Sequence, residues 1–173
     1  IMNKQFTLGV LFFFLNFLTG DGISESRETA ITRAIEKVGP AVASINVEQH
    51  ISSVSFDPFF GFMYPREIYP MKSSGSGVVI SPDGFVMTNH HVIENADKIS
   101  VTLSGGSEYE AEIVGADITS DLALLKLDGS DFPYAQLGSS EDLLIGEWVI
   151  ALGNPFQLFS ISNKPSASVG IIS

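Results

Sequence analysis

The chain has 173 residues, of which 45% are hydrophobic and 17% are charged, a balance typical of a globular rather than a disordered protein. Its 20 acidic and 9 basic side chains give a formal net charge of −11, which argues against binding to nucleic acid or to an anionic membrane. It has no cysteine, so disulfides, thiolate metal sites and a cysteine nucleophile are excluded.

The first 22 residues have the features of an export signal. Lys4 supplies a positive charge, and the segment from Phe6 to Leu18 is almost wholly apolar. That segment is shorter than the roughly 20 residues needed to cross a bilayer, and it has the length of a signal-peptide core. We therefore predict a signal peptide over residues 1–22 and a periplasmic location, which the lack of cysteine also favours. A retained membrane anchor is the alternative.

Residues 24–38 are predicted to form a helix. Four apolar residues repeat at the i, i+3, i+4 and i+7 spacing of one helix face: Ile31, Ala34, Ile35 and Val38. Ser24 or Ser26 can cap the start of this helix, and Gly39-Pro40 is expected to end it.

The rest of the chain has the pattern of an all-β protein. Short apolar runs predict strands at residues 42–47, 77–80, 85–88, 99–103, 109–114, 122–127 and 148–152. Two pairs of these runs flank strong turn sequences, at residues 81–84 and 104–107, and are predicted to form hairpins. Strands this short and this closely spaced indicate an antiparallel barrel or sandwich rather than a parallel sheet.

A long segment between two of these strands, residues 50–72, is predicted to be a loop. It is rich in aromatic residues and proline: Phe56, Phe59, Phe60, Phe62, Tyr64, Tyr69, Pro58, Pro65 and Pro70. Loops of this length are uncommon in compact domains and are usually functional or mobile. Exposed rings would suit a contact with another chain or with an unfolded substrate, whereas rings folded back on the barrel would form a lid. Both alternatives stay open.

Catalytic chemistry is indicated by histidine and aspartate residues at the ends of predicted strands. His90 and His91 follow the strand at residues 85–88, and Asp121 directly precedes the strand at residues 122–127. An aspartate in that place lies at a barrel edge, where we expect its carboxylate to be buried against an imidazole. Such a carboxylate fixes the histidine tautomer and stabilises the imidazolium, whereas a buried carboxylate without a partner would be costly.

Four motifs carry a resemblance to a known family. They are Ser-Gly-Ser-Gly-Val-Val-Ile at 74–80, Thr-Asn-His-His-Val at 88–92, Asp-Leu-Ala-Leu at 121–124 and Leu-Gly-Asn-Pro-Phe at 152–156. Their order and spacing resemble those of the HtrA/Deg serine proteases, over about residues 35–173. The resemblance implies a chymotrypsin-like double β-barrel within a protease domain of residues 23–173. Its first barrel is then complete at about 35–130, and the start of its second barrel lies at about 137–173.

The resemblance also implies roles for the histidine and aspartate residues. In the family pattern Thr-Asn-x-His-Val, the general base corresponds to His91, and His90 occupies the variable position. Asp121 then orients His91. A metal site that includes His90 is the rival interpretation, but no accompanying ligand spacing supports it. The mechanism that the family implies needs no cofactor and no metal.

The family nucleophile is not found among these residues. It belongs to a Gly-Asn-Ser-Gly-Gly motif, and the chain contains neither that motif nor Gly-x-Ser-x-Gly. Ser76, between two glycines, precedes the histidines, where the family has a barrel strand whose glycines permit close packing. The chain reads Ile-Met at its start and ends inside an apolar run. We therefore expect the serine beyond Ser173, the alternative being an inactive relative.

The function expected from this resemblance is that of a serine endopeptidase in envelope protein quality control, acting on unfolded or misfolded proteins. A proteolytically inactive chaperone or binding module is the alternative. Residues 24–173 expressed alone are expected to show no proteolysis. The resemblance further implies assembly as a homotrimer and PDZ domains outside these residues.

Overall fold

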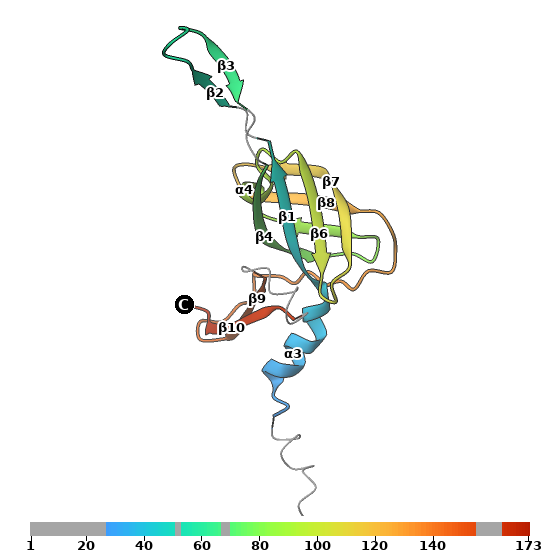
Figure 1. Cartoon of the computed structure of the whole chain (residues 1–173). Coiled ribbons are helices and arrows are strands. Elements are labelled where there is room, and N and C mark those ends of the chain that lie inside the picture. Colours follow the sequence, from blue (N-terminus) through green and yellow to red (C-terminus); the bar gives the residue numbers. More distant parts are fainter. Residues whose placement is uncertain (1–26, 51–52, 67–69, 155–163) are drawn as a thin grey trace, which may run out of the picture. The chain divides into compact units, whose positions relative to one another are not determined.

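The computed structural model describes residues 27–50, 53–66, 70–154 and 164–173 (Figure 1). The chain divides into two compact units, Ile1–Ala34 and Ile35–Ser173. The predicted signal peptide lies outside the described residues.

Helix α3 (Ala30–Val38) begins later than the sequence predicts. Residues 27–29 are not helical. The hydroxyl of Thr29 accepts a hydrogen bond from the backbone N–H of Thr32 at 3.2 Å, so Thr29 caps the helix. The predicted caps Ser24 and Ser26 lie outside the described residues. The predicted apolar stripe is confirmed, because its four residues are the half-buried ones in the helix. The helix ends as predicted, at the 3-10 turn η1 (Gly39–Ala41).

Six strands form a closed antiparallel barrel (Figure 1). In order around the barrel they are β1 (Val42–Gln49), β4 (Met71–Val79), β5 (Phe85–Thr88), β8 (Leu122–Leu127), β7 (Glu108–Asp117) and β6 (Lys98–Leu103). Strand β6 pairs with β1 and closes the barrel, so no edge of it stays unpaired. Both predicted hairpins are confirmed, as β4–β5 and β6–β7.

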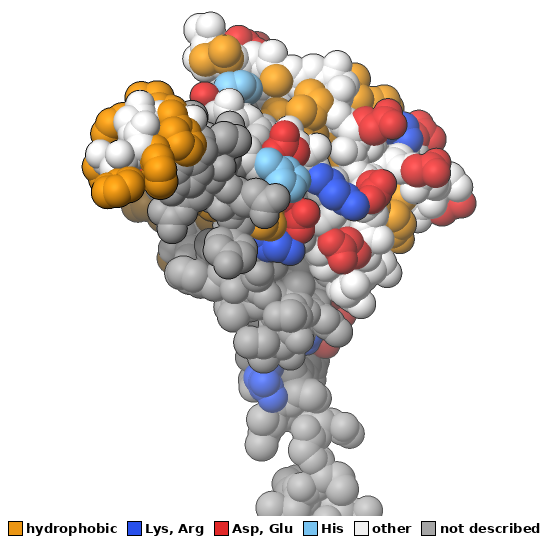
Figure 2. Space-filling view, turned by 45° about the horizontal axis from the view of Figure 1, so that its top comes forward, with side chains coloured by type: hydrophobic (Ala, Val, Ile, Leu, Met, Phe, Trp, Pro, Cys, Tyr) orange, Lys and Arg blue, Asp and Glu red, His pale blue; other side chains and the backbone are white. Residues whose placement is uncertain are grey.

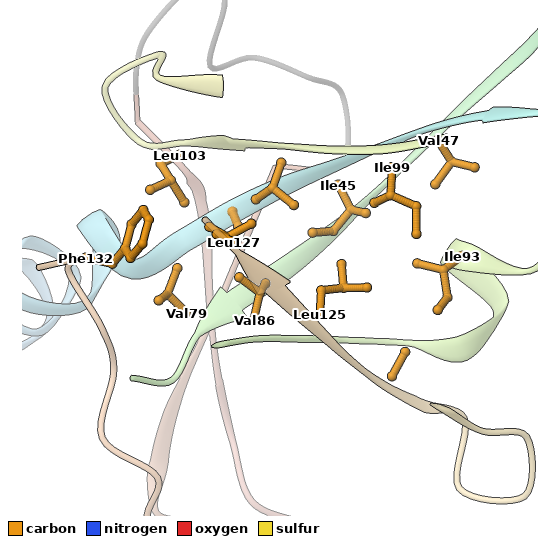
Figure 3. Close-up of a cluster of buried hydrophobic side chains, with 13 residues drawn as sticks. Ile45, Val47, Val79, Val86, Ile93, Ile99, Leu103, Leu125, Leu127 and Phe132 are labelled. Carbon is orange, nitrogen blue, oxygen red and sulfur yellow. The ribbon is translucent and has the colours of Figure 1, made fainter. Parts of the chain in front are cut away.

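The barrel encloses one apolar core (Figure 3). Strands β1, β6 and β8 contribute alternate buried residues to it, whereas β7 packs against it through the partly buried Tyr109 and Ala111. In β8, for example, Ala123, Leu125 and Leu127 are buried. Figure 3 shows Phe132 and Leu103 towards one end of the core. Gly84 has a positive φ of 88°, and an added Cβ would lie 2.7 Å from the Phe132 ring. Only glycine therefore fits the β4–β5 turn beneath this ring.

Two shorter pairs of strands accompany the barrel. Strands β9 (Trp148–Gly153) and β10 (Ser166–Ile171) pair in antiparallel fashion, with Ser166 opposite Gly153. Strands β2 (Ser53–Phe56) and β3 (Met63–Arg66) form a hairpin. The all-β expectation is confirmed, with one closed barrel and the two strands of a second sheet.

The β2–β3 hairpin corrects the prediction of a continuous loop at residues 50–72. Its turn is organised by Asp57, whose carboxylate accepts hydrogen bonds from the backbone N–H groups of Phe59 (2.8 Å) and Phe60 (3.1 Å). Gly61, with φ 68°, donates its N–H to the Asp57 carbonyl. The rings of Phe56, Phe59, Phe60 and Phe62 are all exposed, which favours the contact alternative over the lid.

Candidate active site

The register of the barrel brings the two predicted catalytic segments together. Strands β5 and β8 are antiparallel neighbours, and Thr88, the last residue of β5, lies opposite Ala123 near the start of β8. The residues that follow Thr88 therefore meet the residue that precedes β8, which is Asp121. The short helix α4 (His90–Ile93) begins there and presents His91 to the Asp121 carboxylate.

Asp121 accepts hydrogen bonds from three consecutive residues. One carboxylate oxygen, Oδ2, lies 2.7 Å from Nδ1 of His91, and the other, Oδ1, accepts the His91 backbone N–H at 2.9 Å. The Asn89 side-chain amide donates to Oδ2 at 3.3 Å and to the Asp121 carbonyl at 3.0 Å. That carbonyl also accepts the His90 backbone N–H at 3.2 Å. Because Nδ1 of His91 faces Asp121, Nε2 is left as the nitrogen for substrate chemistry.

The two histidines are distinguished by these contacts. The imidazole of His91 contacts Asp121, whereas His90 contributes its backbone N–H. This arrangement agrees with the Thr-Asn-x-His-Val register. Among the described residues, no group of three or more metal-ligating side chains is found.

The Asp121 carboxylate is stabilised in its ionised form. The His91 backbone N–H, the His91 imidazole and the Asn89 amide hold the pKa of Asp121 below its ordinary value, in that order of importance. The expectation of a buried carboxylate is wrong for the described residues, because the Asp121 side chain is 44% exposed and that of His91 is 67% exposed. The pair lies at the rim of the barrel, where the contacts come from one side only.

Asp121 also has an unusual backbone conformation, which was not predicted. Its φ of 54° lies in the left-handed region, which residues other than glycine rarely adopt. Aspartate and asparagine tolerate this region better than most residues, and that is the one signal in the sequence. An outlier of this kind is frequently found at functional sites.

The remaining two motifs pack against this site. An added Cβ on Gly75 would lie 2.6 Å from both γ-methyl groups of Val92, so the first motif approaches the second through a glycine, as expected. The Ser76 carbonyl accepts a hydrogen bond from the Thr88 hydroxyl at 2.8 Å. The Ser76 hydroxyl accepts one from the backbone N–H of Asn154, in the fourth motif, also at 2.8 Å. All four motifs therefore meet in one region of the fold.

Residues 75–173 match the family model described as the trypsin-like peptidase domain. The chain belongs to the trypsin-like peptidase family. The HtrA/Deg resemblance is confirmed by its relatives. A probable periplasmic serine endoprotease, DegP-like, of Ectopseudomonas mendocina is 38% identical over 165 residues, covering 82% of this chain and 34% of the relative. A putative serine protease HhoB of Synechocystis is also 38% identical, over 83% of this chain and 35% of the relative.

A solved structure supports the fold. The crystal structure of the serine endoprotease from Yersinia pestis superposes with a TM-score of 0.64 and 31% sequence identity, covering 84% of this chain and 45% of that chain. The chymotrypsin-like fold class is thereby confirmed, with a closed first barrel and part of a second. The chain spans about a third of the length of the curated relatives named here.

A second histidine–aspartate contact lies elsewhere on the barrel and was not predicted. Nδ1 of His50, directly after β1, lies 3.0 Å from Oδ2 of Asp97, directly before β6. The same carboxylate accepts the His50 backbone N–H, and this bond is the largest cause that holds the pKa of Asp97 below its ordinary value. The contact joins the ends of two paired strands, and strand pairing is sufficient to explain it.

Proposed function

We propose that the protein is a serine endopeptidase in which His91 is the general base and Asp121 orients it. The observation that carries the proposal is the 2.7 Å contact between His91 Nδ1 and Asp121 Oδ2. With Nδ1 held by the carboxylate, Nε2 takes the proton of a serine hydroxyl as that oxygen attacks a peptide carbonyl. His91 then protonates the leaving amine, and Asp121 stabilises the imidazolium between the two steps.

The nucleophilic serine is proposed to come from residues outside this chain. No Gly-Asn-Ser-Gly-Gly or Gly-x-Ser-x-Gly sequence occurs in the 173 residues, and the chain spans about a third of its curated relatives. Ser76 is a poor candidate, because it lies within the barrel strand β4 and its hydroxyl already accepts a hydrogen bond from the Asn154 backbone N–H. We expect residues 24–173 alone to be inactive, since the oxyanion hole would be lacking together with the serine.

We further propose that the protein acts in the periplasm on unfolded or misfolded proteins. Relatives from several bacteria are named periplasmic serine endoproteases. Within the described part of the chain, no helix has both the length and the apolar character needed to span a membrane. Acidic side chains gather over the barrel on the face shown in Figure 2, and this charge favours solubility.

A second candidate function, that of a non-proteolytic binding module, is favoured by the β2–β3 hairpin. The exposed rings of Phe59, Phe60 and Phe62 stand close together, with centroids 5.0 Å apart for the first pair and 6.0 Å for the second. Exposed apolar clusters mark contacts with other proteins. A protease and a binding module could both use such a surface, so the two proposed functions are distinguished by whether His91 supports catalysis.

The test is a comparison of His91→Ala with His90→Ala in the full-length protein, with casein as substrate. We expect His91→Ala to abolish hydrolysis, because Nε2 is lost, and His90→Ala to keep most of it. Circular dichroism and melting temperature report whether each variant is folded. Equal loss of activity in two folded variants would contradict the assignment of the base. Full activity in His91→Ala would overturn the proposed protease mechanism.

A further inference from the structure

The turn that leads into Asp121 is held by a second aspartate. Asp117 is the last residue of β7, and residues 118–121 make the turn to β8. The Asp117 carboxylate accepts a hydrogen bond from the backbone N–H of Thr119 at 3.0 Å and one from the hydroxyl of Ser120 at 2.7 Å. One exposed side chain therefore holds two of the three residues that separate it from Asp121.

This turn has to maintain a conformation that Asp121 would not choose by itself. The left-handed φ of 54° at Asp121 is disfavoured for a residue with a side chain. Such conformations persist only where the surrounding structure fixes them. On the amino-terminal side, the backbone bond from Asp121 N–H to the Ile118 carbonyl is long, at 3.4 Å. The two contacts of Asp117 are the shorter hydrogen bonds of this turn.

The conformation of Asp121 decides where both of its acceptor groups lie. Its carbonyl faces Asn89 and the His90 N–H, and its carboxylate faces the N–H and the imidazole of His91. A change of φ at Asp121 would swing both groups together relative to the preceding turn, so that their contacts with residues 89–91 would be lost. A displacement of about 1 Å in a catalytic group is enough to lower turnover by up to about 100-fold.

We propose that Asp117 is a positioning residue for the His91–Asp121 pair, and that it acts by fixing the 118–121 turn. This inference rests on the proposed protease function. The hydrogen bonds of Asp117 go to the Thr119 N–H and the Ser120 hydroxyl and not to His91, so its effect passes through the turn. Hydrogen bonds from the Ser120 hydroxyl and then the Thr119 N–H hold the pKa of Asp117 below its ordinary value, so the carboxylate is ionised at neutral pH.

The experiment compares Asp117→Ala with Asp117→Asn in the full-length protein. Alanine removes both contacts. Asparagine keeps an oxygen for the Thr119 N–H and an NH₂ group that can donate to the Ser120 hydroxyl. Asp128→Ala is the matched control, because Asp128 is an exposed aspartate at the other end of β8. A fluorogenic peptide substrate gives kcat and KM separately for each variant.

We expect Asp117→Ala to lower kcat and kcat/KM together by about 10- to 100-fold with KM nearly unchanged, as for a lost transition-state geometry. We expect Asp117→Asn to recover most of the activity and Asp128→Ala to match the wild type. A wild-type kcat in folded Asp117→Ala would overturn the proposal. So would a loss that the asparagine variant shares in full, because positioning through the turn predicts rescue.

Two further variants keep the outcome decisive. If Asp117→Ala does not fold, Ser120→Ala removes only the 2.7 Å contact, and a smaller loss of kcat at constant KM is then expected. An unchanged kcat in Ser120→Ala would then count against the proposal. His91→Ala is measured beside them. If it is inactive while Asp117→Ala equals the wild type, the positioning role alone fails. If it is fully active, the proposed protease function itself fails.

Discussion

Replacing Asp121 with asparagine tests the central contact of the site while it preserves the size of the side chain. The two carboxylate oxygens now accept from His91 at 2.7 Å (Nδ1) and 2.9 Å (backbone N–H). Asparagine has one oxygen, and if that oxygen stays on the backbone N–H, its NH₂ group faces Nδ1. Nδ1 then has to accept a hydrogen bond, and the imidazole proton moves to Nε2. A protonated Nε2 cannot take a proton from serine.

Asp121→Asn has two effects, the loss of the correct His91 tautomer and the loss of a negative charge beside His91, and their sizes differ. The corresponding change in a Ser-His-Asp protease lowers turnover by about 10⁴-fold. The side chains of His91 and Asp121 are well exposed in the described residues, so water screens the charge component of their contact. Screening does not restore the correct tautomer. We therefore expect Asp121→Asn to lose about 10³- to 10⁴-fold in kcat with little change in KM.

The assay is steady-state cleavage of a fluorogenic peptide by the full-length protein, with melting temperature as the check of folding. Asp128→Asn, at the opposite end of β8, is the control for removal of one exposed negative charge. The reasoning is refuted if folded Asp121→Asn turns over within a few-fold of the wild type. An equal loss in the control would show that net charge, and not the contact with His91, sets the rate.

Three further predictions concern packing, pH and the hairpin. Gly75→Ala should lower the free energy of unfolding by about 1–3 kcal/mol, because its Cβ would lie 2.6 Å from Val92, and adding Val92→Ala should recover part of the loss in urea titrations. Because the pKa of Asp121 is lowered in the folded protein, the wild type should be more stable than Asp121→Asn above about pH 4. This difference should disappear as the pH falls through the folded-state pKa of Asp121. A difference in urea midpoint that does not depend on pH would contradict this prediction. Deleting residues 53–66 should change oligomer size or the preference for unfolded protein while cleavage of a small peptide persists, and unchanged behaviour in all three assays would argue against a contact surface.

The parts of the fold that could be predicted are those in which side-chain alternation is strict. The strand predicted at residues 122–127 is β8 to the residue, because Ala123, Leu125 and Leu127 face the core and the residues between them do not. The β4–β5 hairpin was predicted as well, since Gly84 marks its turn. In both cases consecutive residues determine the burial pattern, so the local sequence is sufficient to predict the element.

Other parts depend on contacts that no local pattern encodes. Strand β4 begins at Met71, six residues before the predicted start, because its polar first half pairs with β1 as far as Gln49. The β2–β3 hairpin was missed because its strands have four residues each and one of them contains Pro65. Strand β7 continues to Asp117, past a register shift at Gly115 that interrupts the alternation.

The same division applies to the site. The motif register singled out His91 and Asp121, and the barrel register brings them to hydrogen-bonding distance. The left-handed φ of Asp121 has only the residue type as a signal in the sequence, and the support of its turn by Asp117 has none. The prediction of a buried Asp121 does not hold for the described residues, in which the Asp121 side chain lies at the rim of the barrel and is 44% exposed.

These observations indicate how the fold places the His91–Asp121 pair at the rim of the barrel. Backbone groups make much of the link, since the Asp121 carbonyl and carboxylate accept the N–H groups of His90 and His91. Backbone atoms at the ends of paired strands are fixed by the barrel, whose closure prevents β5 and β8 from sliding past each other. If the two side chains alone made the contact, each of them could still adopt several rotamers, and the geometry of the pair would be less well fixed. The register of β5 and β8 therefore sets the geometry of the His91–Asp121 pair. Variants that disturb the turn into β8 should lower activity more than variants of exposed residues near the pair.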